Sequence, residues 1–361
     1  MGHADKKRLG SLDLCRGIAI LMVVGFHASL TYPPSRWIAR VAELGNMGVQ
    51  LFFLVSAVTM CHMWEQRHEE SNRALKFYIR RFFRIAPLFW FAIIFYTLLW
   101  HMQPGLHGLS GITPLQIVLT ATFLHPFAPS AINSVVPGGW SIGIEMGFYV
   151  IFPILVSLRQ DRLLVFAFAS YVLLGVAGTY VAEGFGSGEP YAIFLYYSFL
   201  TQLPIFPIGM FVYATTHRQA SPKPIQTSLL IMLWLLIAFI AKGEFHLTAC
   251  PFLWLEIALL AGFVWCSIHW SWGSRFLSFF GRLSYSMYLF HFAVLYFLER
   301  LFGDGWPFPI GFAATLSATI LIAKLSQQSA EKWSQDAGRT LIGALERRNH
   351  IHGLPVKSSH Q

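Results

Sequence analysis

The first apolar segment of the chain carries ionisable residues whose types and spacing suit chemistry. It runs from Leu12 to Leu30, which is long enough to cross a bilayer, and it contains Arg16 and His27, with Asp13 spaced to pair with Arg16. Ionisable side chains in hydrocarbon are costly, so by default they mark a functional site. Eleven helical steps of about 100° return to nearly the same azimuth, so Arg16 and His27 share one face, about 16 Å apart. We therefore expect one of them near each side of the membrane.

Arginines gather again before the third apolar segment. Arg80, Arg81 and Arg84 lie directly before Pro87, at spacings that place Arg84 on a helix face with each of the other two. Guanidinium groups at a helix end suit phosphate recognition. The alternatives are an ordinary positively charged anchor and a contact with lipid headgroups.

A carboxylate lies between two hydroxyl groups in the fourth apolar segment. Ser141, Glu145 and Tyr149 are each four residues apart, so they share one helix face. A carboxylate in hydrocarbon needs a partner or a proton. We expect Glu145 to belong to the site, and the alternative is a structural polar contact between helices.

A second polar stripe lies in the ninth apolar segment. Ser284, Tyr288 and His291 fall at i, i+4 and i+7 of one helix, and Glu256 lies near the start of the eighth segment. The structural alternatives are a core histidine with satisfied hydrogen bonds, and a carboxylate paired with a neighbouring helix. We expect these residues to contact a substrate.

The predicted depths divide these residues into two zones. The outer half of the membrane holds His27, Glu145, Glu256 and His291. Arg16 and the arginines at 80–84 fall at the inner side. The division predicts an inner zone that binds an anion and an outer zone for acid–base chemistry, so a phosphate-rich donor would dock from the cytoplasm and extend its reactive end outward.

The elements that position these residues are those of a polytopic membrane protein. Of 361 residues, 55% are hydrophobic and 12% are charged, and a soluble domain carries about 25% charged residues. Windows of about 20 apolar residues predict an all-α fold with about ten spans. These are 12–30, 45–64, 85–101, 139–158, 163–181, 191–214, 225–241, 251–270, 278–298 and 309–328. The formal net charge of +9 follows the ends of these spans, so we do not expect nucleic acid as a partner.

Basic residues in the connections predict the orientation. Most of the 26 lysines and arginines fall in alternate connections, and the other connections hold only Arg36, Arg40, Lys242 and Arg300. The positive-inside rule then places both termini in the cytoplasm. We expect the first span to be retained rather than cleaved as a signal peptide, a transmembrane domain over residues 1–333 and a polar cytoplasmic tail over residues 334–361.

The longest outer connection, 102–137, contains no charged residue of the Lys, Arg, Asp or Glu types. Its apolar stretch from Thr113 to Leu124 is too short to span a bilayer, so we expect a re-entrant or interfacial helix. The four cysteines lie in or beside apolar runs without a metal-ligand pattern. We read them as small buried hydrophobic residues, and we expect no metal.

Five segments, in this order along the chain, resemble the acyltransferase-3 family of integral membrane acyltransferases, which includes bacterial O-acetyltransferases. The first is the arginine, ten residues and histidine from Arg16 to His27. The others are GVQLFFLVSA at 48–57, RRFFRIAPL at 80–88, WSIGIEMGFYVIFP at 140–153 and GRLSYSMYLFH at 281–291. Two departures stand out: Gly143 and Met146 replace residues that are often polar or acidic, and Trp333 replaces a proline after Glu331.

The resemblance implies an acyl-CoA donor at the cytoplasmic face and an acceptor on the outside. His27 then matches the family's essential histidine and Arg16 its partnered arginine, while Arg81 and Arg84 match the pair that holds the donor's phosphates. It favours acetyl-CoA over longer donors and places the protein in a bacterial inner membrane. The acceptor would be a carbohydrate or glycolipid, and membrane lipid surrounds the protein.

The leading hypothesis is acyl transfer to a sugar hydroxyl, with His27 as general base or as covalent acyl carrier. The catalytic candidates are His27, Arg16, Glu145 and Asp13, and the donor-binding candidates are Arg80, Arg81 and Arg84. The substrate-binding candidates are Trp140, Ser141, Tyr149, Ser284, Tyr288, His291 and Glu256. The alternative is a transporter or proton-coupled permease that uses the same buried groups. The sequence leaves the acceptor and the oligomeric state open.

Overall fold

The computed structural model describes residues 3–102, 111–158, 162, 166, 194, 196–216, 250–271 and 273–351. Every regular element in these ranges is a helix, as expected for an all-α protein. Five of the described helical segments are long and apolar enough to cross a membrane, and two more apolar helices are shorter. The spans expected at 163–181 and 225–241, and part of 191–214, lie outside the described residues.

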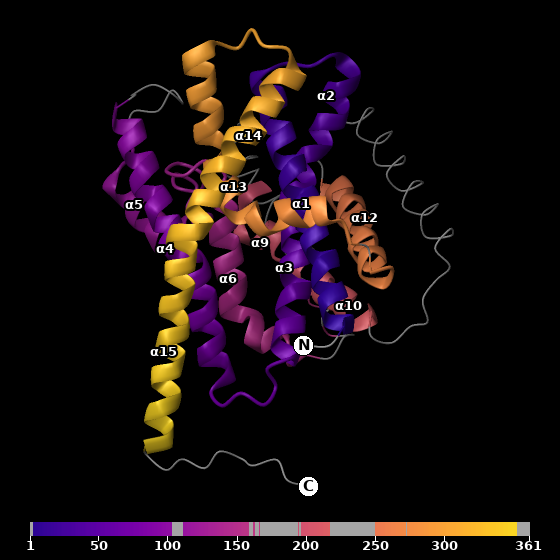
Figure 1. Ribbon diagram of the computed structural model, residues 1–361, viewed down its shortest axis with the longest axis vertical. Coiled ribbons are helices and arrows are strands. Elements are labelled where there is room, and N and C mark those ends of the chain that lie inside the picture. Colours follow the sequence, from indigo (N-terminus) through magenta and orange to yellow (C-terminus); the bar gives the residue numbers. More distant parts are fainter. Residues whose placement is uncertain are drawn as a thin grey trace, which may run out of the picture.

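The N-terminal third of the chain forms α1 (His3–Thr31), α2 (Arg36–Glu43), η1 (Leu44–Met47), α3 (Gly48–Glu65) and α4 (Arg73–Met102). Apolar residues pack around α1 and α3 in the largest buried cluster. Figure 1 shows α1 and α3 near the middle of the molecule, with α4 beside them.

The middle of the chain forms α5 (Pro114–Ala121), η2 (His125–Phe127), α6 (Trp140–Leu155), α9 (Phe199–Gln202) and α10 (Ile205–Thr216). The short helix expected between residues 113 and 124 is α5. It begins with a capping box in which the side chains of Thr113 and Gln116 bond reciprocally to backbone N–H groups.

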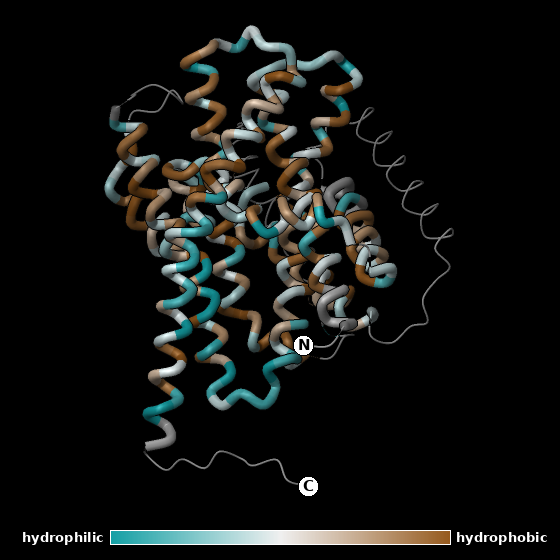
Figure 2. The backbone as a smooth tube through the Cα atoms, viewed as in Figure 1, coloured by the Kyte–Doolittle hydropathy of each residue, from teal (hydrophilic) through white to brown (hydrophobic). Residues whose placement is uncertain are grey.

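The C-terminal part forms α12 (Cys250–His269), α13 (Arg275–Phe302), α14 (Phe308–Ser326), η3 (Gln327–Glu331) and α15 (Lys332–Ile351). The expected tail therefore begins two residues inside α15, a helix that lies along α4 (Figure 1). In Figure 2, hydrophilic residues concentrate along α15 and at the turn between α3 and α4, whereas the middle of the bundle is hydrophobic.

Helices α1 and α13 pack backbone to backbone. A Cβ atom at Gly17 would lie 2.0 Å from the Leu277 carbonyl oxygen, and one at Gly281 would lie 1.9 Å from the Asp13 carbonyl oxygen. Small residues permit such close helix approach in membranes. Ten residues further along each helix, His27 contacts His291. Gly17 also approaches Gly281, and the Gly17–Gly281 and His27–His291 pairs are each 264 positions apart, so α1 and α13 run parallel and in register.

Helix α4 begins twelve residues before the expected span and continues through Pro87, so Arg80, Arg81 and Arg84 lie within the helix rather than before it. Proline cannot donate to the carbonyl four residues earlier, which here belongs to Phe83. The Ser334 hydroxyl of α15 donates to that carbonyl instead. The helix therefore stays continuous because α15 satisfies the group that Pro87 releases.

The chain segment before α6 is folded into the protein. Residues 135–144 are all buried, the Trp100 indole donates to the Val135 carbonyl (2.9 Å), and Gly138 has a φ of +74°, which favours glycine. Helix α6 therefore begins in the interior of the protein, one residue after the expected start of this span at residue 139.

Candidate active site

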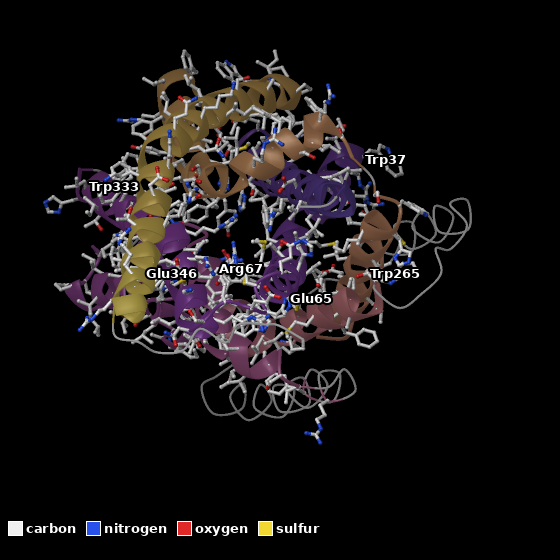
Figure 3. All side chains as sticks on the ribbon, turned by 60° about the horizontal axis from the view of Figure 1, so that its bottom comes forward. Trp37, Glu65, Arg67, Trp265, Trp333 and Glu346 are labelled. Carbon is white, nitrogen blue, oxygen red and sulfur yellow. The ribbon has the colours of Figure 1, made fainter. Side chains whose placement is uncertain are left out.

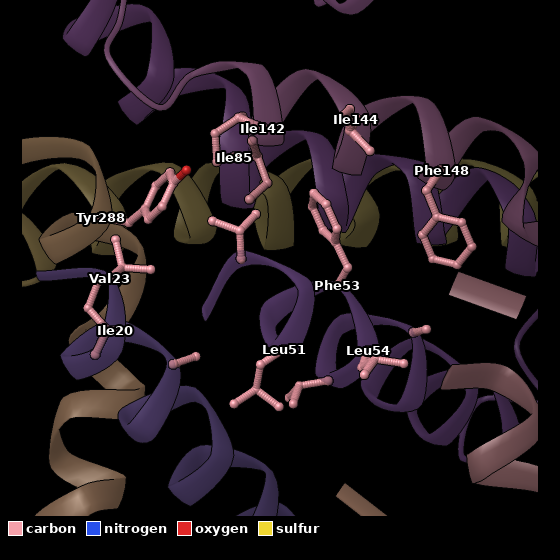
Figure 4. Close-up of a cluster of buried hydrophobic side chains, with 14 of the residues drawn as sticks. Ile20, Val23, Leu51, Phe53, Leu54, Ile85, Ile142, Ile144, Phe148 and Tyr288 are labelled. Atoms are coloured by element: carbon pink, nitrogen blue, oxygen red, sulfur yellow. The ribbon is translucent and has the colours of Figure 1, made fainter. Parts of the chain in front are cut away.

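A cavity lies among α1, α3, α4, α6 and α13. Its charged lining residues are Arg16, Arg81, Arg84 and Glu145. Around them lie Val49, Phe52, Phe53, Ser56, Ile85, Ser141, Ile142, Tyr149, Ser284, Tyr285 and Tyr288. Four separate polar segments of the sequence thus meet in one cavity, beside the apolar cluster drawn in Figure 4.

Arg16 is held by two partners. Its Nη1 atom bonds to Asp13 Oδ1 at 3.0 Å, and its Nη2 atom donates to Thr59 Oγ1 at 2.6 Å. The expected pairing of Asp13 with Arg16 is therefore present. Thr59 was not a sequence candidate, and a hydroxyl group within an otherwise apolar segment was the signal that could have identified it.

Glu145 accepts two hydrogen bonds on one oxygen. The hydroxyl groups of Ser56 and Tyr149 each donate to its Oε1 atom at 2.5 Å. Ser56 lies three residues before Thr59 on α3, so Glu145 is near the level of Arg16 rather than the level of His27. The sequence grouped Glu145 with His27, whereas the structure brings it to the cavity that Arg16, Arg81 and Arg84 line.

Arg81 and Arg84 line the same cavity but make no hydrogen bond or ion pair with any residue that the structure describes. The Arg81 guanidinium carbon lies 5.6 Å from the centre of the Tyr149 ring and 5.8 Å from that of Phe77, so aromatic faces support it. Guanidinium groups in a cavity without a carboxylate of their own can bind an anion.

Arg80 points to a different neighbour. Its Nη2 atom lies 2.6 Å from Glu70 Oε1, and its side chain does not line the cavity. The three arginines of the RRFFR segment, which looked alike in sequence, therefore divide into a pair that faces the cavity and one that forms an ion pair outside it.

His27 and His291 form a contact pair between α1 and α13. The His291 Nε2 atom lies 3.2 Å from His27 Nδ1, which in turn lies 2.9 Å from the Val23 carbonyl oxygen. His291 Nδ1 lies 2.7 Å from the Tyr288 carbonyl oxygen, and the His291 side chain is fully buried. The ring of Phe292 lies 4.3 Å from that of His27.

Tyr288 connects the histidine pair to the cavity. Its carbonyl contacts His291, while its hydroxyl lines the cavity, donates to the Gly138 carbonyl (2.9 Å) and accepts from the Ser141 hydroxyl (2.9 Å). A Cβ atom at Gly138 would lie 3.0 Å from the Tyr288 hydroxyl oxygen, so glycine allows this close approach. Neither histidine lines the cavity. His291 lies about one turn beyond Tyr288 on α13, and His27 of α1 contacts His291.

Two expected substrate contacts lie elsewhere. Trp140 packs against Tyr197 with ring centres 4.4 Å apart, and Glu256 lies partly buried on α12. Neither lines the cavity. Glu331 is buried and accepts a hydrogen bond from Ser286, also outside the cavity. Among the described residues, no group of three His, Cys, Asp or Glu side chains could hold a metal ion.

A model of an acyltransferase domain matches residues 9–325. The chain belongs to the acyltransferase-3 family. This membership confirms the resemblance carried by the five sequence segments.

Individual relatives are distant. The "Putative membrane-bound transacylase BcsY" of Komagataeibacter xylinus is 25% identical over 79% of this chain and 72% of its own length. A "Putative O-acetyltransferase" of Staphylococcus aureus is 23% identical over 91% of this chain and 58% of its own length. The peptidoglycan O-acetyltransferase OatA of Listeria monocytogenes is 26% identical over 41% of this chain and 24% of its own length. No solved structure matches the chain.

Proposed function

We propose that this acyltransferase moves an acetyl group from cytoplasmic acetyl-CoA to a hydroxyl group of a carbohydrate or glycolipid acceptor. The observation that carries the proposal is the pair of cavity-lining guanidinium groups, Arg81 and Arg84, without a described partner. A donor with several phosphate groups would neutralise them. The names of the relatives, which include O-acetyltransferases, support the acetyl group and the oxygen acceptor.

The hydrogen bonds around His27 support a role as general base. The carbonyl oxygens of Val23 and Tyr288 can only accept, so in neutral rings the Nδ1 atoms of both histidines carry the protons. His291 Nε2 is then an acceptor that faces the His27 Nδ1–H group. This arrangement leaves His27 Nε2 with a free lone pair.

The reaction follows from that lone pair. His27 Nε2 takes the proton of the acceptor hydroxyl as its oxygen attacks the thioester carbonyl, and the carbon–sulfur bond breaks. The proton on His27 then passes to the departing CoA thiolate, which restores the neutral ring. His291 acts as a positioning residue that holds the tautomer of His27, rather than as the substrate contact expected from sequence.

Glu145 and Asp13 take structural roles at the donor end. Asp13 orients the Arg16 guanidinium, and Glu145 offsets part of the positive charge of the cavity while it holds Ser56 and Tyr149 in place. Partial neutralisation reduces repulsion among three arginines while leaving an excess of positive charge for the donor.

We also propose ten spans with both termini in the cytoplasm of a bacterial inner membrane. The parallel packing of α1 with α13 supports this topology, since the first and ninth spans of such a chain run in the same direction. Figure 1 places the beginning of α1 and the end of α15 toward the same pole as the α3–α4 turn, which is rich in arginine.

The decisive test uses the full chain purified in lipid nanodiscs with radiolabelled acetyl-CoA. Saturable binding and slow release of acetate are expected, with His27→Ala retaining binding but losing release, and Arg81→Gln/Arg84→Gln losing binding. Mass spectrometry of envelope glycans from a deletion strain complemented with each variant then identifies the acceptor by the missing acetyl increment. Unchanged acetyl transfer by His27→Ala, or substrate flux without consumption of acetyl-CoA, would refute the proposal.

A further inference from the structure

A second, smaller pocket lies beside the cavity, at the turn between α3 and α4. It is lined by Met63, Trp64, Arg67, Arg73, Phe77, Arg80 and Arg81. Four of its seven lining residues are arginines and none is acidic. Arg81 lines both this pocket and the large cavity, so the two spaces lie on either side of one side chain. Figure 3 shows Arg67 near the middle of the pole that carries this turn.

The hydrogen bonds of the pocket are incomplete. Arg67 and Arg80 both contact the same oxygen of Glu70, at 3.5 Å and 2.6 Å, and the other oxygen of Glu70 is buried without a partner among the described residues. Within the same part of the chain, the buried Nε atom of Arg73 also has no acceptor, although its Nη2 atom donates to the Trp64 carbonyl. Glu70 and, for Arg73, Glu65 thus serve a cluster of four arginines, so the pocket holds more positive than negative charge.

Two of the positive charges in the pocket, those of Arg67 and Arg80, destabilise one another. Burial, and then the neighbouring charge of Arg80, lower the pKa of Arg67 below its usual value. The Arg73 guanidinium carbon lies 4.0 Å from the centre of the Trp64 ring, which fixes it over the indole. An anion with several oxygen atoms would relieve the repulsion and supply the acceptors that the arginines lack.

We propose that this pocket binds the 3′-phosphate of the donor's nucleotide, while Arg81 and Arg84 in the large cavity hold the remaining phosphates and the acyl end extends from that cavity toward His27. The inference rests on the proposed function, because it divides one acyl-CoA molecule between two adjoining spaces that share Arg81. Glu70 contacts Arg67 and Arg80 where the phosphate would bind, and the nucleotide displaces it from them. Recognition of the donor therefore depends on its nucleotide as well as on its thioester.

The test compares donors with and without the nucleotide. The full chain in zwitterionic lipid nanodiscs is assayed with acetyl-CoA and with acetyl-pantetheine, and acetyl-CoA binding is competed with adenosine 3′,5′-bisphosphate. In wild type the bisphosphate should compete. In Arg67→Gln/Arg73→Gln the ratio of kcat/KM for acetyl-CoA over acetyl-pantetheine should fall at least tenfold. Arg348→Gln, an exposed arginine on α15, is the matched control and should keep the wild-type ratio.

A second variant keeps the test decisive if the double variant does not fold. Glu70→Gln removes the competing charge, so the bisphosphate should bind more tightly and protect this variant from thermal unfolding more than it protects wild type. An unchanged donor ratio, or bisphosphate that never competes while anionic lipid does, would overturn the inference and leave the proposed function intact. Absence of acetyl-CoA binding to wild type would instead overturn the proposed function itself.

Discussion

At the residue scale, the proposed chemistry depends on which nitrogen of each histidine carries a proton. Backbone carbonyls determine this, because Val23 and Tyr288 offer only acceptors to the Nδ1 atoms. His291 then matters through its Nε2 lone pair rather than through contact with substrate. The shared face of Arg16 and His27 was predictable from spacing, but the partner of His27 depends on a helix 264 positions away.

We predict that His291→Leu lowers kcat by about tenfold to a hundredfold with little change in KM, because His27 loses the acceptor that orients it. His291→Gln should recover most of the activity, since its side-chain oxygen can accept the same hydrogen bond. The measurement is steady-state transfer in nanodiscs, with the melting temperature of each variant as a control for folding. Equal loss in both variants at equal stability would argue against a positioning role.

The arginines illustrate what residue spacing alone leaves undetermined. Arg80 and Arg81 are neighbours in sequence, yet Arg80 pairs with Glu70 and Arg81 faces the cavity. Helix geometry places adjacent side chains about 100° apart, but only the packed structure determines which of them meets a carboxylate. Glu145 is a similar case, because only the packed structure brings it to the cavity that Arg16 lines.

At the element scale, Gly17 of α1 and Gly281 of α13 determine how closely the histidine-bearing helices approach. A Cβ atom at Gly17 would meet the backbone of α13, so the helices would have to separate, whereas a Cβ atom at Gly10 on the same helix meets nothing within 4 Å. The sequence alone does not distinguish Gly10 from Gly17. The distinction comes from the path of α13.

We predict that Gly17→Ala lowers the melting temperature and also reduces kcat, because separation of α1 from α13 draws His27 away from His291. Gly10→Ala should be neutral or slightly stabilising, since alanine favours a helix over glycine by about 1 kcal/mol. Thermal unfolding and transfer rates of the two variants, measured in parallel, check the prediction. A Gly17→Ala protein with wild-type stability and rate would show that the close approach is unnecessary.

Helix α15 acts on the arginine helix through one hydrogen bond. Ser334 donates to the carbonyl that Pro87 leaves without a partner, and Gly338 packs against Phe83, where a Cβ atom would lie 3.0 Å from Phe83 Cβ. Without the Ser334 hydroxyl, the Phe83 carbonyl just before Arg84 would lose this partner while α15 still partly covers it. The sequence predicted a polar tail here, but its role in completing α4 follows only from the contact.

We predict that Ser334→Ala destabilises the protein by about 1–3 kcal/mol, the usual effect of leaving a buried polar group unpaired. Ser329→Ala is the control, because its hydroxyl bonds within its own helical segment at an exposed site. Denaturation of both variants in detergent measures the difference. Equal stability of Ser334→Ala and Ser329→Ala would mean that another group satisfies the Phe83 carbonyl.

At the scale of the whole molecule, the distribution of charge and the path of the helices agree. The all-helical fold and its membrane character follow from composition and from apolar windows, which reflect burial in lipid rather than any particular contact. Orientation is a further step, because the positive-inside rule counts residues in connections and not contacts between helices. Parallel α1 and α13 match the direction that the rule assigns to the first and ninth spans.

The topology leads to opposite predictions for two exposed connections. Ser71, in the arginine-rich turn between α3 and α4, should face the cytoplasm, and Asp304, between α13 and α14, should face the outside. In intact cells, a membrane-impermeant maleimide should therefore label Asp304→Cys at once but label Ser71→Cys only after permeabilisation. The wild-type chain, whose described cysteines are buried, gives the background. Labelling of both sites in intact cells would mean that Ser71 and Asp304 lie on the same side of the membrane, with an even number of spans between them. The arginine cavity and its neighbouring pocket would then face away from the cytoplasmic donor, and the proposed direction of transfer would be reversed.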